Sequence, residues 1–361
     1  MPDASVLPDA TTADGALLVL AIALPAIGVL LSFVLGGQYA ERIAAVLLPS
    51  GLVLASIIFV DVWRSGDRLV YIVGDWKPPL GIALRTDGLA AAMMMAVAVV
   101  ICAVAIFARA DFGTRAGSAE ARAPFAFWIL LMAIWGAMNL IFLGGDLFTL
   151  YVAIELLTFA AVPLVCLDGR AETLQAALRY LLFALLGSIL YLVGTALLYG
   201  SYATLDIVLL SGRIHIEPAT LVAATLMTIG LFAKTALFPL HLWLPPAHAG
   251  APAAASAVLS AVVVKGSFFI VVRLWFDVMP GMLGLSGAQL FGVLGAAAII
   301  FGNVVALQQQ RLKLLIAYST VAQIGYLFLM FPLALDAMSA ELQSGPALTG
   351  GMARSRGRRA F

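Results

Sequence analysis

Long apolar runs recur along almost the whole chain and constrain its fold more than any other feature. We interpret ten of them as membrane-spanning helices, because a run of roughly 18 or more apolar residues matches the thickness of a bilayer. The expected spans are residues 16–35, 43–60, 88–108, 125–144, 147–167, 174–200, 219–240, 253–276, 286–308 and 313–334. Only helices and closed barrels satisfy their own backbone hydrogen bonds in lipid, and these runs are too long and too uniformly apolar for barrel strands. We therefore predict an all-α, polytopic bundle of about ten transmembrane helices in a cell membrane.

The composition excludes a water-soluble globule and a nucleic-acid-binding protein. Hydrophobic residues make up 63% of the 361 residues and charged residues 11%, whereas soluble domains are about half apolar and a quarter charged. The net charge of +1 leaves no basic face for nucleic acid. The sequence has no P-loop and no dinucleotide-binding glycine motif, and Cys102 and Cys166 form no C-x-x-C pair. We expect no cofactor, no metal site and no redox centre in this chain.

The chain divides into three parts. Residues 1–122 hold the first three apolar runs and a long connection in which short β-friendly stretches flank "GDWKPP", so we predict a surface β-hairpin there. Lysine and arginine are slightly more frequent in the loops of the opposite side, which places this hairpin outside the cell. Residues 123–334 hold the remaining runs. Residues 335–361 form a polar, basic tail that is too short to span a membrane, and we expect it to be aberrant or disordered.

Three ionisable residues lie well inside the expected spans, namely Glu155, Lys234 and Lys265. A charge near the bilayer centre costs about 2.5–3.5 kcal/mol on insertion scales, and such residues mark ion pathways or mutual ion pairs. Lys265 is about twelve residues from either end of its span, so roughly 18 Å of helix separates it from water. Lys234 could reach the interface if its helix ended at Pro239. The apolar residues beyond that proline favour instead a segment that continues after a break.

The segment "LFAKTALFPLHLWLPPAHAGAP" combines Lys234 with several prolines. Proline removes a backbone donor and clashes with the carbonyl four residues earlier, so we predict a helix break at Pro239 and Pro245. Free backbone groups at membrane depth are tolerated only against protein or a water-filled cavity. We therefore predict a hydrated site in which Glu155 is the counter-ion of Lys234. Movement of the glutamate would let the lysine release its proton.

His241 and His248 flank the break and have two interpretations. Either the imidazoles extend a proton relay, since they titrate near neutral pH, or they hydrogen-bond carbonyls that the break sets free. A metal site is a weaker alternative, because no third ligand stands at a useful spacing. Small polar residues of the later spans could carry water or merely tie helices together. They are Ser256, Ser260, Asn303, Tyr318, Ser319, Thr320 and Gln323.

Three stretches resemble the antiporter-like subunits shared by respiratory complex I, membrane-bound hydrogenases and Mrp-type Na⁺/H⁺ antiporters. They are "LYVAIELLTFAAVPLV", "FAKTALFPLHLWLPPAHAGAPAAASAVLSAVVVKG" and "RLKLLIAYSTVAQIGYLF". The resemblance covers roughly residues 15–335, and "GDWKPPLGIALRTDGLAA" looks most like the D-type Mrp subunit. It implies a fold of about fourteen helices built from two inverted repeats, each with a broken helix.

The resemblance also implies proton translocation through buried charged residues. Glu155 matches the glutamate of the fifth helix, Lys234 the lysine at the broken seventh helix, and Lys265 the lysine of the eighth. His241 and His248 match the histidines that flank the break. By this resemblance residues 123–334 form a proton-translocating core, the partners are other membrane subunits, and the ions are protons, with Na⁺ as an alternative. The family continues beyond the tenth helix, so we expect a C-terminally truncated product.

Two other functions stay open. A secondary transporter of a small solute would also use a broken helix near the bilayer midplane, although no isolated counter-charge for a substrate stands out here. A truncated chain could instead serve as a non-conducting structural subunit. An enzyme label such as NADH:quinone oxidoreductase would belong to the parent complex, because we find no residues here that bind NADH or reduce quinone.

Overall fold

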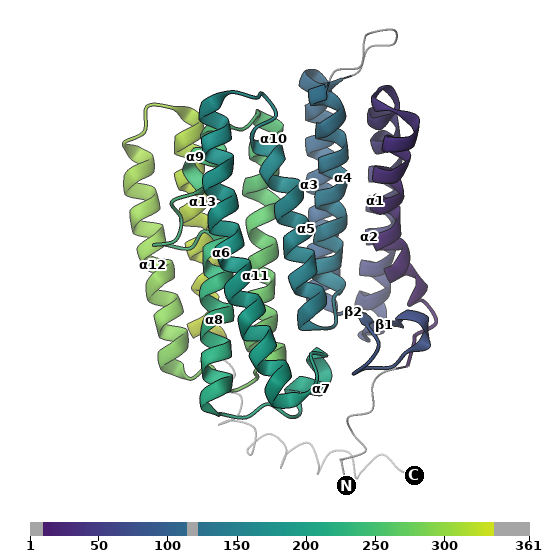
Figure 1. Ribbon diagram of the computed structural model, residues 1–361, viewed down its shortest axis with the longest axis vertical. Helices are drawn as coiled ribbons and strands as arrows, with labels where there is room; N and C mark the ends of the chain where they lie inside the picture. Colours follow the sequence, from purple (N-terminus) through teal and green to yellow (C-terminus); the bar gives the residue numbers. More distant parts are fainter. Residues whose placement is uncertain (1–9, 114–121, 336–361) are drawn as a thin grey trace, which may run out of the picture.

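A computed structural model describes residues 10–113 and 122–335, which form a helical bundle with one short hairpin (Figure 1). Within these ranges 10 helices are long and apolar enough to cross a membrane, so the predicted all-α polytopic fold is confirmed. These helices are α1 (Ala16–Leu35), α2 (Gly37–Ser65), α3 (Gly88–Phe112), α4 (Arg122–Leu143), α5 (Leu147–Val165), α6 (Ala171–Tyr202), α8 (Pro218–Thr235), the composite span Ala253–Val278, α12 (Leu285–Leu307) and the span Leu312–Leu335, which begins with α13 (Leu312–Phe328). The expected tail lies outside the described residues from position 336 onward.

The composite span contains two π-turns, so its helical type changes three times. Its parts are α10 (Ala253–Val258), the π-turn η2 (Leu259–Val263), α11 (Val264–Arg273) and the π-turn η3 (Leu274–Val278). Such π-turns widen a helix locally and are frequent at functional sites. Two short helices lie between the spans, α7 (Ile207–Ser211) and α9 (Leu244–Gly250).

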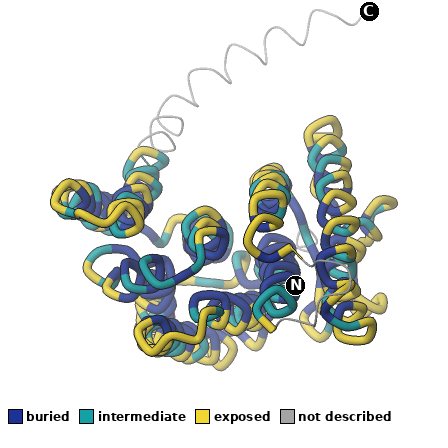
Figure 2. The backbone as a smooth tube through the Cα atoms, turned by 90° about the horizontal axis from the view of Figure 1, so that it is seen from above, coloured by how far each residue is buried: buried dark blue, intermediate teal, exposed yellow. Residues whose placement is uncertain are grey.

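The exposed surface of the bundle is apolar. Viewed from above, buried residues line the interfaces between helices and exposed residues form the outer rim (Figure 2). Val34, Leu182 and Leu307 are 80%, 68% and 87% exposed, respectively. Exposure of such an apolar surface to water would cost free energy, whereas lipid solvates it. The pattern of burial and the composition therefore both place the bundle in a membrane.

The predicted β-hairpin is present at the end of the bundle where α2 ends and α3 begins (Figure 1). Strands β1 (Leu69–Ile72) and β2 (Ala83–Thr86) pair antiparallel, with Leu69 opposite Thr86. The 3-10 turn η1 (Val73–Asp75) starts the connection between them. The amide of Thr12 donates to the Val70 carbonyl over 2.9 Å, which ties the segment before α1 to the hairpin.

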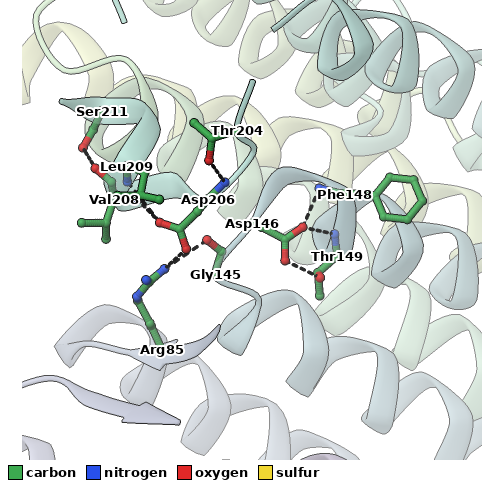
Figure 3. A network of polar contacts seen from close by, with 10 residues as sticks. All are labelled: Arg85, Gly145, Asp146, Phe148, Thr149, Thr204, Asp206, Val208, Leu209 and Ser211. Atoms are coloured by element: carbon green, nitrogen blue, oxygen red, sulfur yellow. Dashed lines mark hydrogen bonds and ion pairs between the residues drawn. The ribbon is translucent and has the colours of Figure 1, made fainter. Parts of the chain in front are cut away.

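Arg85 on β2 joins the hairpin to the neighbouring helix ends (Figure 3). Its guanidinium lies 2.7 Å from the Asp206 carboxylate and donates to the Gly145 carbonyl over 3.2 Å. Asp206 also caps α7, and Asp146 caps α5, each by accepting bonds from two backbone amides. The hairpin is therefore held against the bundle by buried charge and by helix caps rather than by its own short ladder.

A second ion pair links the hairpin end to the composite span. Arg273 lies 2.5 Å from Asp87, which caps α3, and 2.6 Å from Asp277. Burial opposes ionisation of Asp87, but the Arg273 guanidinium and the Ala90 amide hold the pKa of this carboxyl below its usual value. Because Arg273 ends α11, the pair fixes the helix that carries Lys265 relative to the hairpin.

Candidate functional site

Lys234 lies in the last turn of α8 with its ammonium group inside the protein. Its side chain is 4% exposed. The Nζ atom donates to the Thr158 hydroxyl over 2.8 Å, lies 3.3 Å from the Glu155 carboxylate and reaches the Ile154 carbonyl at 3.4 Å. All three oxygens belong to α5, so one face of that helix surrounds the charge. The alternative in which Lys234 reaches the interface does not fit this placement.

Glu155 occupies the middle of α5 and is 14% exposed. Its carboxylate accepts a hydrogen bond from the Ser188 hydroxyl of α6 in addition to the contact with Lys234. The glutamate and the lysine predicted as counter-ions therefore lie in contact. A carboxylate with two donors and a lysine with three acceptors form a charge-balanced site, which is the condition for keeping ions in a low-dielectric interior.

The site depends on the close approach of α6 to α8. A Cβ atom added to Gly187 would stand 2.6 Å from the Gly230 carbonyl oxygen and 3.1 Å from Cγ of Lys234. Only glycine, which has a hydrogen atom in place of Cβ, fits at position 187 without a shift of the helices. Because Ser188 follows Gly187, this contact also brings the Ser188 hydroxyl to Glu155.

The predicted helix break follows Lys234 directly. Helix α8 ends at Thr235 and Ala236 adopts a left-handed conformation with φ 58°, so the break starts before Pro239 and the seventh predicted span was too long. The carbonyl of Ala233, in the last turn of α8, accepts a bond from the Ala236 amide over 3.3 Å and another from the Trp243 indole N–H over 2.9 Å. Pro245 lies in the first turn of α9, where its missing N–H costs nothing, so it starts a helix rather than breaking one.

His241 and His248 lie on either side of α9's first turn and are both buried. His241 is 3% exposed, and its ring contacts the rings of Phe238 and Phe301 at centroid distances of 5.4 and 4.9 Å. His248 is fully buried, and its Nδ1 lies 2.7 Å from the Ser256 hydroxyl. Each ring has one buried nitrogen without a partner among the described residues, Nδ1 in His241 and Nε2 in His248. Each ring therefore keeps one nitrogen available for water or a proton.

Lys265 lies at the start of α11, just beyond the π-turn η2. Its ammonium donates to the Ser260 carbonyl, and in the described part of the chain it forms no ion pair. The Ser260 hydroxyl is 2.9 Å from that of Thr320 on α13, so η2 is tied to the last span. Lys265 also acts electrostatically on His248. Lys265 is thus within electrostatic range of His248, whereas no contact joins it to Glu155 or Lys234.

Thr158, Ser188 and Trp243 complete this site, and sequence reasoning did not single them out. Thr158 follows Glu155 by one helical turn, a spacing that would have placed it on the same face. Ser188 and Trp243 carry no such signal, because their partners lie on other segments. The Trp243 ring also stacks on Tyr180 of α6 with centroids 4.2 Å apart, which fixes the turn after the break.

Metal binding finds no support in this region. Within residues 10–113 and 122–335, no group of three or more histidine, cysteine, aspartate and glutamate side chains is arranged to hold a metal ion.

The model of the family described as "NADH:quinone oxidoreductase/Mrp antiporter, TM" matches residues 144–343, more than half of the chain. The chain belongs to this family. The resemblance inferred from three stretches of the sequence, of which one contains Glu155 and another both Lys234 and Lys265, is therefore confirmed.

Relatives come from both branches of the family. The N-type subunit of the NADH-quinone oxidoreductase of Desulforudis audaxviator is 34% identical over 79% of this chain and 56% of its own length. The D-type subunit of the Na(+)/H(+) antiporter of Alkalihalophilus pseudofirmus is 30% identical over 80% of this chain and 57% of its own length. The chain thus spans a little over half of these relatives.

A solved structure shares the fold. A chain of the membrane-bound sulfane sulfur reductase, an archaeal respiratory membrane complex, superposes with a TM-score of 0.77 at 28% identity. The match covers 87% of this chain and 64% of that chain. The arrangement of the bundle is therefore shared with that chain over the matched residues.

Proposed function

We propose that this chain is a proton-translocating, antiporter-like subunit of a multisubunit membrane complex. The observation that carries the proposal is the buried pair of Lys234 and Glu155, which lies directly before a broken helix. A buried charge pair is a poor way to stabilise a bundle, since apolar residues of similar size do so as well or better. The segment that follows Lys234 carries two imidazoles, each with an unpartnered buried nitrogen, which suits a group that exchanges protons.

Proton release from Lys234 depends on the strength of its interaction with the Glu155 carboxylate. Desolvation favours the neutral amine and the adjacent carboxylate favours the ammonium, so small movements of α5 against α8 decide whether the proton stays. The turn after Thr235 holds His241 and leads to His248, and the latter lies within electrostatic range of Lys265. We propose that protons pass from Lys234 along this turn to Lys265.

The partners proposed are other membrane subunits. The relatives are named as subunits of an NADH-quinone oxidoreductase and of a Na(+)/H(+) antiporter, which makes protons the proposed ion and Na⁺ the alternative. We assign residues 123–334 to the translocating core and residues 1–122 to flanking helices with the hairpin. Partner subunits supply the driving force.

Exchange of Lys265 for alanine tests the proposal. In membrane vesicles from cells that make the chain with its partner subunits, Lys265→Ala is expected to lower proton flux about 100-fold, the scale of a lost proton carrier. Lys77→Ala is the matched control, because Lys77 is an exposed lysine of the hairpin connection. Flux that persists in Lys265→Ala at the level of the control would favour a structural subunit over a conducting one.

A further inference from the structure

A cavity of about 570 Å³ lies beside the turn after α8, and neither Lys234 nor Glu155 lines it. Its lining is amphipathic, with three polar side chains and five apolar ones. The polar side chains are Arg179 of α6, His241 of the turn and Tyr318 of α13. The apolar ones are Phe183, Leu242, Pro245, Pro246 and Leu314.

The polar side chains of this cavity have unused hydrogen-bonding capacity. Across residues 10–113 and 122–335, Arg179 has no ion pair and no hydrogen bond, and the Tyr318 hydroxyl has no hydrogen bond. His241 is 3% exposed and its buried Nδ1 has no partner. Arginine keeps its charge at any accessible pH, and guanidinium, phenol and imidazole can all donate. Three potential donors that converge on one cavity call for an anionic acceptor.

The depth of the cavity indicates where that anion comes from. Helix α6 has 32 residues and is about 48 Å long, against roughly 30 Å of hydrocarbon, so each end extends about 9 Å beyond the acyl chains if the helix is centred. Arg179 lies about 12 Å from the start of α6, at the boundary between acyl chains and headgroups. Tyr318 lies about 9 Å from the start of α13, at a similar depth.

We infer that this cavity binds the headgroup of an anionic phospholipid. The Arg179 guanidinium pairs with the phosphate, and Tyr318 and His241 donate to its remaining oxygens. Leu242, which is 58% exposed, and the other apolar lining contact the first acyl methylenes. Arg311 and Lys313 lie at the start of α13, at the same end of the bundle, and favour an anionic over a zwitterionic lipid, whereas Arg170 at that end is paired with Asp168. The site shares His241 with the proposed proton path, but lipid binding does not depend on proton transfer.

Native mass spectrometry of the full chain with its partner subunits tests the inference. The delipidated sample is titrated with phosphatidylglycerol, with phosphatidylcholine and with inorganic phosphate. We expect one tightly held phosphatidylglycerol, and Arg179→Gln is expected to weaken its binding about tenfold, because a charge-assisted bond to phosphate is lost. Arg64→Gln, which changes an exposed arginine at the opposite, hairpin end of the bundle that does not line the cavity, should bind as the wild type does.

Three results would overturn the inference. They are equal retention of phosphatidylglycerol by Arg179→Gln and wild type, equal binding of phosphatidylglycerol and phosphatidylcholine, and competition by inorganic phosphate at the same concentration as the lipid. The last would identify a soluble anion as the ligand. Tyr318→Phe keeps the ring contact with Phe301 and removes only the hydroxyl, so it provides a second variant if Arg179→Gln fails to fold. We expect about threefold weaker lipid binding for it, and unchanged binding would contradict the site.

Discussion

Lys234 stays inside the bundle because α5 presents three oxygens to its ammonium, those of Glu155, Thr158 and Ile154. Of these only Glu155 carries a charge, and it is also bonded by Ser188. Removing one ion of such a pair leaves the other buried without compensation. The ion pair of Glu155 and Lys234 can therefore be tested by its effect on stability, without a measurement of transport.

Glu155→Gln is expected to lower the free energy of unfolding by about 3–5 kcal/mol, since the Lys234 charge then lacks a counter-ion. Thermal unfolding of the purified protein in mild detergent measures the loss. The double variant Glu155→Gln with Lys234→Met removes both charges and should recover most of the stability. Strictly additive losses in the double variant would contradict a direct ion pair.

The sequence identifies Glu155, Lys234 and Lys265 because each places an ionisable side chain within an apolar run. The free-energy cost of a charge inside the membrane makes such residues informative about function. It does not identify Thr158 or Ser188. Hydroxyl side chains occur throughout these spans and most bond their own helix, as Thr225 does with the Leu221 carbonyl. Which hydroxyls turn to a neighbouring helix depends on packing that one sequence does not reveal.

At the scale of elements, the contact between α6 and α8 decides whether the site can form. Gly187→Ala would put a Cβ atom 2.6 Å from a carbonyl oxygen of α8, so the helices must separate. We expect a loss of about 1–3 kcal/mol in the free energy of unfolding, together with reduced proton flux. The control is Gly200→Ala in the same helix, where nothing lies within 4 Å. It should be neutral or slightly stabilising, and equal losses in both variants would refute a specific role of the contact.

The ion pair of Asp87 and Arg273 makes the hairpin end sensitive to acid. Since the folded-state pKa of Asp87 lies below its ordinary value of 3.8, its contribution to stability is present above that pH and is lost as the pH falls through the lowered pKa. Melting temperature measured from about pH 7 to pH 3 should therefore fall at the acid end, and Asp87→Asn should flatten that fall. Asp67→Asn, which changes an exposed carboxylate before β1, should leave the profile unchanged. An identical profile for wild type and Asp87→Asn would contradict the assignment.

Among the elements, the ten spans and the hairpin were predictable, because apolar length and turn residues are local signals. The end of α8 was not, and neither were the π-turns η2 and η3. The end at Thr235 depends on the Trp243 indole, which bonds a carbonyl ten residues before it. The residues of η2, "LSAVV", suit an α-helix equally well, so its widening depends on tertiary packing, which places it against α3, α4 and α5.

At the scale of the whole molecule, the proposed proton-carrying groups lie in two places. Glu155 on α5 contacts Lys234 on α8, and His248 lies within electrostatic range of Lys265 on α11. We propose that protons pass between them along the turn that holds His241. The order of these groups along the chain was predictable. Their adjacency across α5, α6 and α8 was not, because it depends on which helices become neighbours.

The central claim is that these lysines release and regain a proton rather than only supply charge. Lys234→Arg and Lys265→Arg test it most directly, because arginine keeps the charge and can still donate hydrogen bonds but does not deprotonate in proteins. Proton flux in membrane vesicles, measured with a pH-sensitive dye, should fall about 100-fold in each variant, while the melting temperature stays near that of the wild type. Flux at the wild-type rate in either folded arginine variant would contradict the claim, because a permanent charge would then suffice at that position.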